Sequence, residues 1–269
     1  MMPDAAPPSA RALRRAPERR EVALLLGIVL LLNAPGGLLQ RVNLRWGLLV
    51  TQLGCIAAPV FLAIKIFYLD GRAILPLRRP RASELGAAVL GMAGLNHVLN
   101  YAILWQDRFF PMPQILKGLF QDLAAFDGAG DFLILLFVVA VVPAVCEEIL
   151  FRGFVHAGLL QEFESAPKAI VLGALVFAGF HLNPWRFSVL MAIGLFLGFL
   201  VHRTGSLVPA MLAHGLNNAL SLGLAGMDEE AQAFLLHSPW VHAGSAACLA
   251  AAALLLRRGP RWSPGERVL

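Results

Sequence analysis

The chain has 269 residues, of which 58% are hydrophobic and 14% are charged, and its mean hydropathy is +0.69. A water-soluble domain of this length needs more surface charge, so the composition excludes an ordinary soluble protein and indicates several membrane-spanning helices. The formal net charge is +5, but the lysines and arginines stand in short clusters between apolar runs and form no basic stripe, which argues against nucleic acid as a partner.

The apolar runs predict an all-α, polytopic membrane protein with about eight transmembrane helices and both termini cytoplasmic. Residues 1–20 are interpreted as a flexible cytoplasmic tail, 21–257 as one transmembrane domain with its core at about 130–225, and 258–269 as a second cytoplasmic tail. The predicted spans are, in chain order, 22–39, 46–67, 84–105, 131–160, 167–182, 185–202, 206–224 and 240–256.

The distribution of positive charge supports this orientation. With the N-terminus inside, fifteen lysines and arginines fall in inner segments and five in outer segments, as the positive-inside rule requires. The richness in Ala, Leu, Gly and Arg is typical of a bacterial protein, so we expect an integral protein of the bacterial inner membrane.

The predicted outer loop, residues 106–130, mixes aromatic residues with a few charges at loose helical spacing. This pattern is typical either of an amphipathic helix in the membrane interface or of an ordinary loop with a short surface helix. Cysteines 55, 146 and 248 lie inside apolar runs, and their odd number and wide spacing fit neither a disulfide framework nor a metal motif.

Charged side chains are rare within the spans and costly at membrane depth, so each is a functional candidate. Glu147 and Glu148 stand side by side, and Arg152 follows Glu148 by four residues on the same helix face. Arg152 can therefore pair with Glu148. Glu147 points about 100° away and is free for another partner.

Polar side chains in the next spans extend this set. His181 ends one apolar run, and His214 and Asn218 share a face four residues apart in a later one. Glu147 and His181 are equally far from residue 164, in the turn between two predicted antiparallel helices, so they should lie at similar depth. Pro143 can kink the helix next to Glu147 and open space for water.

These residue types suit hydrolysis of an amide bond. A carboxylate beside an imidazole, as with Glu147 and His181, can activate water and transfer its proton. A second imidazole and an amide, as with His214 and Asn218, can stabilise the oxyanion that forms on the attacked carbonyl. No serine or cysteine stands beside a base, so water is the expected nucleophile.

The three motifs resemble those of the CAAX protease and bacteriocin-processing (CPBP, or Abi) family of intramembrane endopeptidases. The family pattern EExxxR, FxxxH, HxxxN occurs here as Glu147, Glu148 and Arg152, then Phe177 and His181, then His214 and Asn218. The resemblance covers residues 130–225 and implies an eight-helix fold and glutamic-type chemistry without a cofactor. It implies that Glu147 and His181 activate water, that His214 and Asn218 form the oxyanion site, and that Glu148 and Arg152 orient the pocket. The substrate would be a membrane protein or a lipidated peptide.

Other interpretations stay open at this stage. Glu147, His181 and His214 could hold zinc with an open water position, although no H-E-x-x-H motif is present. Buried acid and histidine chains also occur in proton-coupled transporters, and a catalytically idle relative could act as an immunity protein.

A second polar group lies in the third predicted span, where Asn96 and Asn100 share a face and His97 lies beside them. These side chains could line a substrate cavity, or they could simply form hydrogen bonds between helices.

Overall fold

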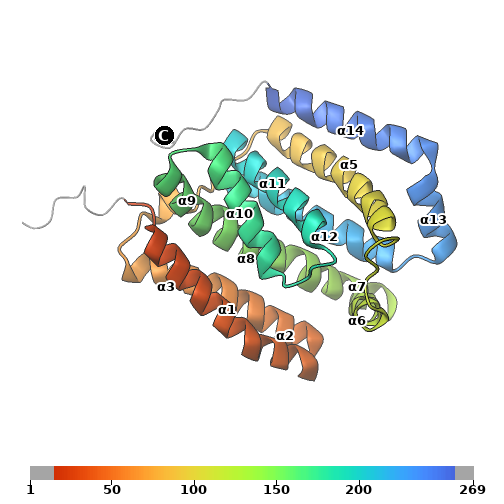
Figure 1. Ribbon diagram of the computed structural model, residues 1–269, viewed down its shortest axis with the longest axis horizontal. Coiled ribbons are helices and arrows are strands. Elements are labelled where there is room, and N and C mark those ends of the chain that lie inside the picture. The colour runs from red at the N-terminus through yellow and green to blue at the C-terminus, as the bar shows by residue number, and fades with distance from the viewer. Residues whose placement is uncertain (1–14, 258–269) are drawn as a thin grey trace, which may run out of the picture.

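The computed structural model describes residues 15–257, apart from the side chains of residues 119, 120, 123 and 229, and this range is helical without strands (Figure 1). Its elements, in chain order, are α1 (Arg19–Val42), α2 (Leu44–Val50), η1 (Thr51–Ala57), α3 (Ala58–Ile66), α4 (Gly71–Ile74), α5 (Ala82–Gln106), α6 (Gln114–Ala124), α7 (Gly128–Leu136), η2 (Phe137–Val141), α8 (Val142–Glu148), η3 (Ile149–Val155), α9 (His156–Phe163), α10 (Ala166–Phe180), α11 (Phe187–Thr204), α12 (Leu207–Ala225), α13 (Glu229–His237) and α14 (Pro239–Arg257). The elements labelled η are π-helical turns.

The predicted class, an all-α polytopic membrane protein, is confirmed. Within the described residues, six helical segments are long and apolar enough to cross a membrane, namely Arg19–Val42, Leu44–Ile66, Ala82–Gln106, Gly128–Phe163, Phe187–Thr204 and Pro239–Arg257. The other two predicted spans correspond to α10, a shorter apolar helix, and to α12. The number eight and the cytoplasmic placement of both termini stay predictions. Residues 1–14 and 258–269 of the two predicted tails lie outside the described residues.

The helices form three neighbouring groups (Figure 1). The α1–α2 hairpin, together with η1 and α3, lies on one side of the bundle, and α5 with α14 lies on the opposite side. Between them, α8 packs against both η1 and α12, while α10 packs along α11. The helix that carries the two glutamates is therefore enclosed by segments from early and late in the chain.

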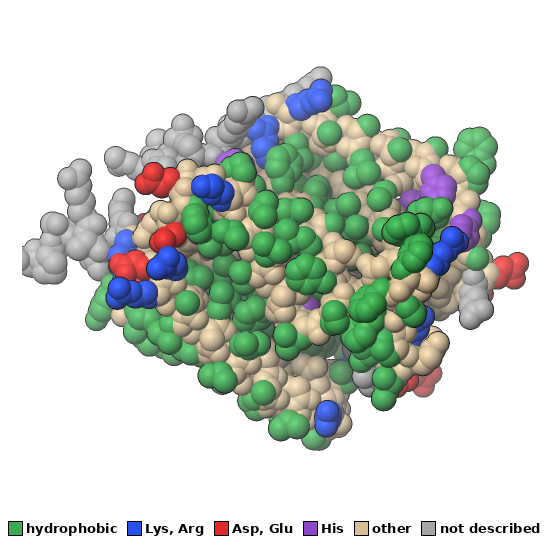
Figure 2. All heavy atoms as spheres, in the orientation of Figure 1, with side chains coloured by type: hydrophobic (Ala, Val, Ile, Leu, Met, Phe, Trp, Pro, Cys, Tyr) green, Lys and Arg blue, Asp and Glu red, His purple; other side chains and the backbone are tan. Residues whose placement is uncertain are grey.

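The outward surface fits a lipid environment. Figure 2 shows a face covered mainly by hydrophobic side chains, with the charged side chains gathered toward its ends. Exposed large apolar side chains occur on nearly every long helix, and a water-soluble protein rarely exposes such continuous apolar surface. The predicted outer loop contains α6, the short helix that both interpretations of that loop included.

Two glycines permit the close helix contacts that fix the bundle. A Cβ at Gly94 of α5 would lie 2.7 Å from the carbonyl oxygen of Ser245 on α14, and the Ser245 hydroxyl donates to the Gly94 carbonyl at 2.8 Å. A Cβ at Gly194 of α11 would lie 2.9 Å from the Cβ of Ala174 on α10. Small residues of this kind let membrane helices approach closely, which brings the polar side chains between them into reach.

Three π-helical turns surround the glutamates. Two of them, η2 and η3, flank α8 in its own helix, and η1 packs against α8 from the second span. Each π turn contains an extra residue, so it rotates the side chains that follow relative to a regular helix. Pro143, near the start of α8, has no N–H with which to continue the hydrogen-bond pattern after η2.

Candidate active site

Glu147 and Glu148 are the last two residues of α8, and both are buried. Because adjacent helical residues point about 100° apart, the two carboxylates meet different partners. Glu148 is fully buried, and its Oε1 accepts hydrogen bonds from Arg152 Nη1 at 2.8 Å and from His214 Nδ1 at 2.9 Å. The predicted ion pair between Glu148 and Arg152 is confirmed, and the contact with His214 was not predicted.

Arg152 is satisfied on several sides within the bundle. Its Nη2 donates to the Gly194 carbonyl at 3.2 Å, and its guanidinium carbon lies 4.2 Å from the centre of the Phe177 ring. A buried charge is tolerated only when paired and hydrogen-bonded in this way. Arg152 therefore fixes the Glu148 carboxylate, which in turn holds His214.

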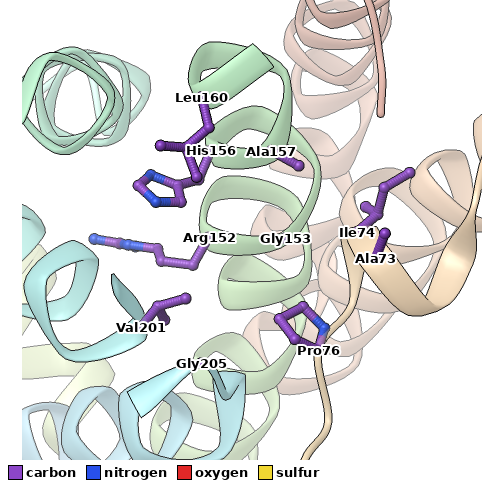
Figure 3. Close-up of a pocket in the computed structure, with 10 residues that line it drawn as sticks. All are labelled: Ala73, Ile74, Pro76, Arg152, Gly153, His156, Ala157, Leu160, Val201 and Gly205. Atoms are coloured by element: carbon purple, nitrogen blue, oxygen red, sulfur yellow. The ribbon is translucent and has the colours of Figure 1, made fainter. Parts of the chain in front are cut away.

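Arg152 also lines a small pocket with His156 and a mostly apolar wall that includes Pro76 and Val201 (Figure 3). His156 is buried, and its Nε2 has no hydrogen-bond partner within the described residues. The pocket is lined by no carboxylate, and Glu147 does not belong to it. It therefore adjoins the glutamate–histidine cluster through Arg152 and does not include Glu147.

Glu147 has a different environment from its neighbour. Its Oε1 accepts a hydrogen bond from Gln52 Nε2 at 2.9 Å, whereas its Oε2 has no hydrogen-bond partner among the described residues. This Oε2 lies 3.8 Å from His181 Nε2 and 3.9 Å from His214 Nε2. Both separations exceed a direct hydrogen bond, and one water molecule can bridge atoms at such distances.

The hydrogen bonds of the two histidines fix which ring nitrogen faces Glu147. His181 caps the end of α10, and its Nδ1 lies 2.8 Å from the Phe177 carbonyl, which can only accept, so this nitrogen carries the proton. Likewise, His214 Nδ1 donates to Oε1 of Glu148, the same oxygen that accepts from Arg152. In both rings Nε2 is therefore the nitrogen directed at Glu147.

Asn218 lies one helical turn beyond His214 on α12, and its position depends on Pro143. In a regular helix the N–H of residue 143 would bond to the carbonyl of Val139, but proline has no N–H. The Asn218 Nδ2 instead lies 3.4 Å from that carbonyl oxygen. Asn218 forms no hydrogen bond to the glutamates or to either histidine of the cluster within the described residues; its bonds go to Val139 and Asn217.

A chain of side-chain amides orients Asn218. Asn100 Nδ2 donates to Asn96 Oδ1 at 2.9 Å, and Asn96 Nδ2 donates to Asn217 Oδ1 at 3.0 Å. Asn217 Nδ2 then donates to Asn218 Oδ1 at 3.3 Å. Each link determines the direction of the next, so the amide nitrogen of Asn218 is left as the donor toward α8 and η2.

The second polar group mainly joins helices, as one of the two interpretations held. Asn96 of α5 bonds to Asn217 of α12 at 3.0 Å. His97 Nε2 lies 2.8 Å from His242 Nδ1 on α14, so His97 bonds to a helix that does not carry the glutamate–histidine cluster.

The structure thus gathers Glu147, Glu148, Arg152, His181 and His214 into one contacting cluster and places Asn218 beside it. Sequence reasoning missed Gln52 and Asn217, although a lone glutamine inside an apolar span was a usable signal. Within the described part of the chain, no group of three or more His, Cys, Asp or Glu side chains is arranged to hold a metal ion.

The fold and this cluster define a helical integral membrane protein with a buried glutamate–histidine site. Residues 129–220 match the family model described as type II CAAX prenyl endopeptidase Rce1-like. The predicted resemblance to the CPBP family is therefore confirmed for this segment, which includes every predicted site residue. Comparison with curated proteins and with solved structures gives no match.

Proposed function

We propose that this protein is an intramembrane endopeptidase that hydrolyses a peptide bond of a membrane protein or lipidated peptide, with water activated by Glu147 and His181. One observation carries the proposal within the family match: the Oε2 of buried Glu147, 3.8 Å from His181 Nε2, has no hydrogen-bond partner among the described residues. A carboxylate oxygen and a ring nitrogen at this separation suit a bridging water.

The water-activation step uses the two fixed protonation sites. His181 donates its Nδ1 proton to the Phe177 carbonyl, so the neutral ring offers the Nε2 lone pair. Glu147 and this nitrogen orient the water, and the Glu147 carboxylate removes a proton as the water oxygen bonds to the scissile carbonyl carbon. The same proton then passes to the leaving nitrogen as the C–N bond breaks.

The oxyanion formed in that step would be stabilised by His214 and Asn218. For His214 Nε2 to donate, the ring must carry both protons, and the Glu148 carboxylate at 2.9 Å from Nδ1 stabilises that cationic form. Asn218 Nδ2 is a second donor, since its amide oxygen is held by Asn217. Fixed donors of this kind stabilise developing negative charge without reorganisation during the reaction.

Glu148 and Arg152 act on the reaction through His214 and need no contact with the substrate. We propose that the chemistry uses no metal or other cofactor, because the Glu148 Oε1 atom and the Arg152 guanidinium are already used in protein contacts and the described residues form no metal-holding group of three or more His, Cys, Asp or Glu side chains. We propose a bacterial inner membrane as its location, because the chain is rich in Ala, Leu, Gly and Arg. The lipid bilayer is then the surrounding partner, and no nucleic acid is involved.

The test compares protein termini in membranes of the native host. Cells that express wild type should show cleaved termini that are absent with Glu147→Ala at equal protein level. A matched control is Glu162→Ala, because Glu162 lies in the same long helical segment but forms only a partly exposed pair with Arg19 at 3.5 Å. Identical termini in wild type and Glu147→Ala would refute the proposal.

A further inference from the structure

Gln52 is a buried polar side chain that contacts the candidate site from a distant part of the chain. It lies on η1 in the second span, outside residues 129–220 that carry the family match, and it is 5% exposed. Its Nε2 donates to Glu147 Oε1 at 2.9 Å. Because a carboxylate can only accept, the amide nitrogen must be the atom that faces Glu147.

Packing between η1 and α8 does not by itself require a polar side chain at position 52. The Gln52 Oε1 is buried and has no hydrogen-bond partner among the described residues, and leaving a buried acceptor unpaired is unfavourable. An apolar residue such as leucine would fill the same position between η1 and α8 without that cost. Gln52 Oε1 and Glu147 Oε2 are thus both buried acceptors without a hydrogen-bond partner among the described residues.

The π-helical backbone of η1 sets the direction in which the Gln52 side chain points. The π-helical turn Thr51–Ala57 shifts the side chains of the second span, and π turns in membrane and soluble helices are frequent at functional sites. At the start of this span, Arg45 forms an ion pair with Asp131 at the start of α7, which ties the span to the helix that carries Glu147.

We infer that Gln52 is a positioning residue of the peptidase site, an inference that rests on the proposed function. Its amide holds Glu147 Oε1, so that rotation of the carboxylate is blocked and Oε2 stays directed at His181 and His214. Gln52 acts through Glu147. A loss of this hydrogen bond should therefore lower turnover more than substrate binding, since small errors in the placement of a base are costly.

The test uses purified full-length protein in detergent micelles and a farnesylated peptide with a C-terminal CAAX sequence. Gln52→Met keeps the side-chain volume but has no donor, and we expect kcat to fall about 10- to 100-fold while KM changes less than about 2-fold. The matched control is Gln40→Met. Gln40 donates to Thr51, the neighbour of Gln52, at 3.3 Å and does not contact Glu147, so its kcat should stay near the wild-type value.

A second variant separates positioning from packing. In Gln52→Glu, a protonated carboxyl can donate to Glu147 at low pH, whereas two ionised carboxylates repel each other at higher pH. Its activity should therefore recover as pH falls, while Gln52→Met stays slow throughout. If Gln52→Met fails to fold, the pH profile of Gln52→Glu alone carries the test.

The outcomes distinguish the two proposals. A wild type that cleaves no faster than Glu147→Ala contradicts the proposed function. An active wild type together with a fully active Gln52→Met, or with a Gln52→Glu whose pH profile equals that of wild type, contradicts only the role of Gln52.

Discussion

The buried pair between Glu148 and Arg152 allows structural and catalytic contributions to be measured separately. The two side chains are 0% and 3% exposed and lie 2.8 Å apart. Removing one partner of such a pair leaves a buried charge uncompensated and costs about 3–5 kcal/mol. For a chain of this size, each kcal/mol lowers Tm by about 2–4 °C, so Arg152→Met should unfold about 6–20 °C below wild type.

The double variant Glu148→Met/Arg152→Met should be more stable than either single variant, because both buried charges are gone and their desolvation cost with them. It should nevertheless be inactive, since His214 then has no carboxylate at Nδ1 to orient and charge its ring. If Glu148 acts on the reaction by orienting His214, the double variant should regain stability but not cleavage activity.

The assay is thermal unfolding in one detergent, read alongside peptide cleavage. The control is Arg19→Met, which breaks an ion pair whose side chains are 78% and 37% exposed and should change stability by at most about 1 kcal/mol. The reasoning is refuted if the double variant unfolds at or below the less stable single variant, or if Arg152→Met unfolds at the wild-type temperature.

Two further predictions concern the proposed oxyanion site and the proposed metal-free chemistry. Asn217→Leu removes the donor to Asn218 Oδ1, so the Asn218 amide loses its fixed orientation and we expect kcat to fall about 10-fold. It also removes the acceptor for the buried Asn96 amide, so Tm should fall by about 2–12 °C. An unchanged kcat would show that the amide chain has no catalytic role. Treatment of the purified enzyme with a zinc chelator should leave cleavage unchanged, and activity that disappears with chelator and returns with zinc would support the zinc alternative instead.

Local spacing and hairpin symmetry made part of the site predictable. The ion pair of Glu148 and Arg152 follows from their i,i+4 separation in one helix. The closeness of Glu147 and His181 follows from their equal distance to residue 164, and Glu164 indeed ends α9 with a left-handed conformation at φ 49°. Both predictions use only the geometry of one helix or one hairpin.

The rest depended on relations that no local rule provides. Gln52 and Glu147 are 95 positions apart, and nothing in the sequence specifies how two separate helices are rotated about their axes. The π-helical turns add to this difficulty, because each shifts the facing side chains without a recognisable sequence signal. The hydrogen bond from His214 to Glu148 was missed for the same reason. The sequence indicated the depth of these residues in the membrane but not the rotation of their helices about the helix axes.

Pro143 affects the hydrogen bonding of Asn218 when no substrate is bound. Pro143 leaves the Val139 carbonyl without its usual helical donor, and Asn218 occupies that acceptor through a long 3.4 Å contact. Without substrate, the Asn218 amide nitrogen therefore donates only a weak hydrogen bond to a neutral carbonyl oxygen. In the proposed mechanism, Asn218 would exchange this bond for a stronger one to the charged oxygen of the tetrahedral intermediate. A gain confined to that stage would accelerate the reaction without tightening the binding of substrate or product.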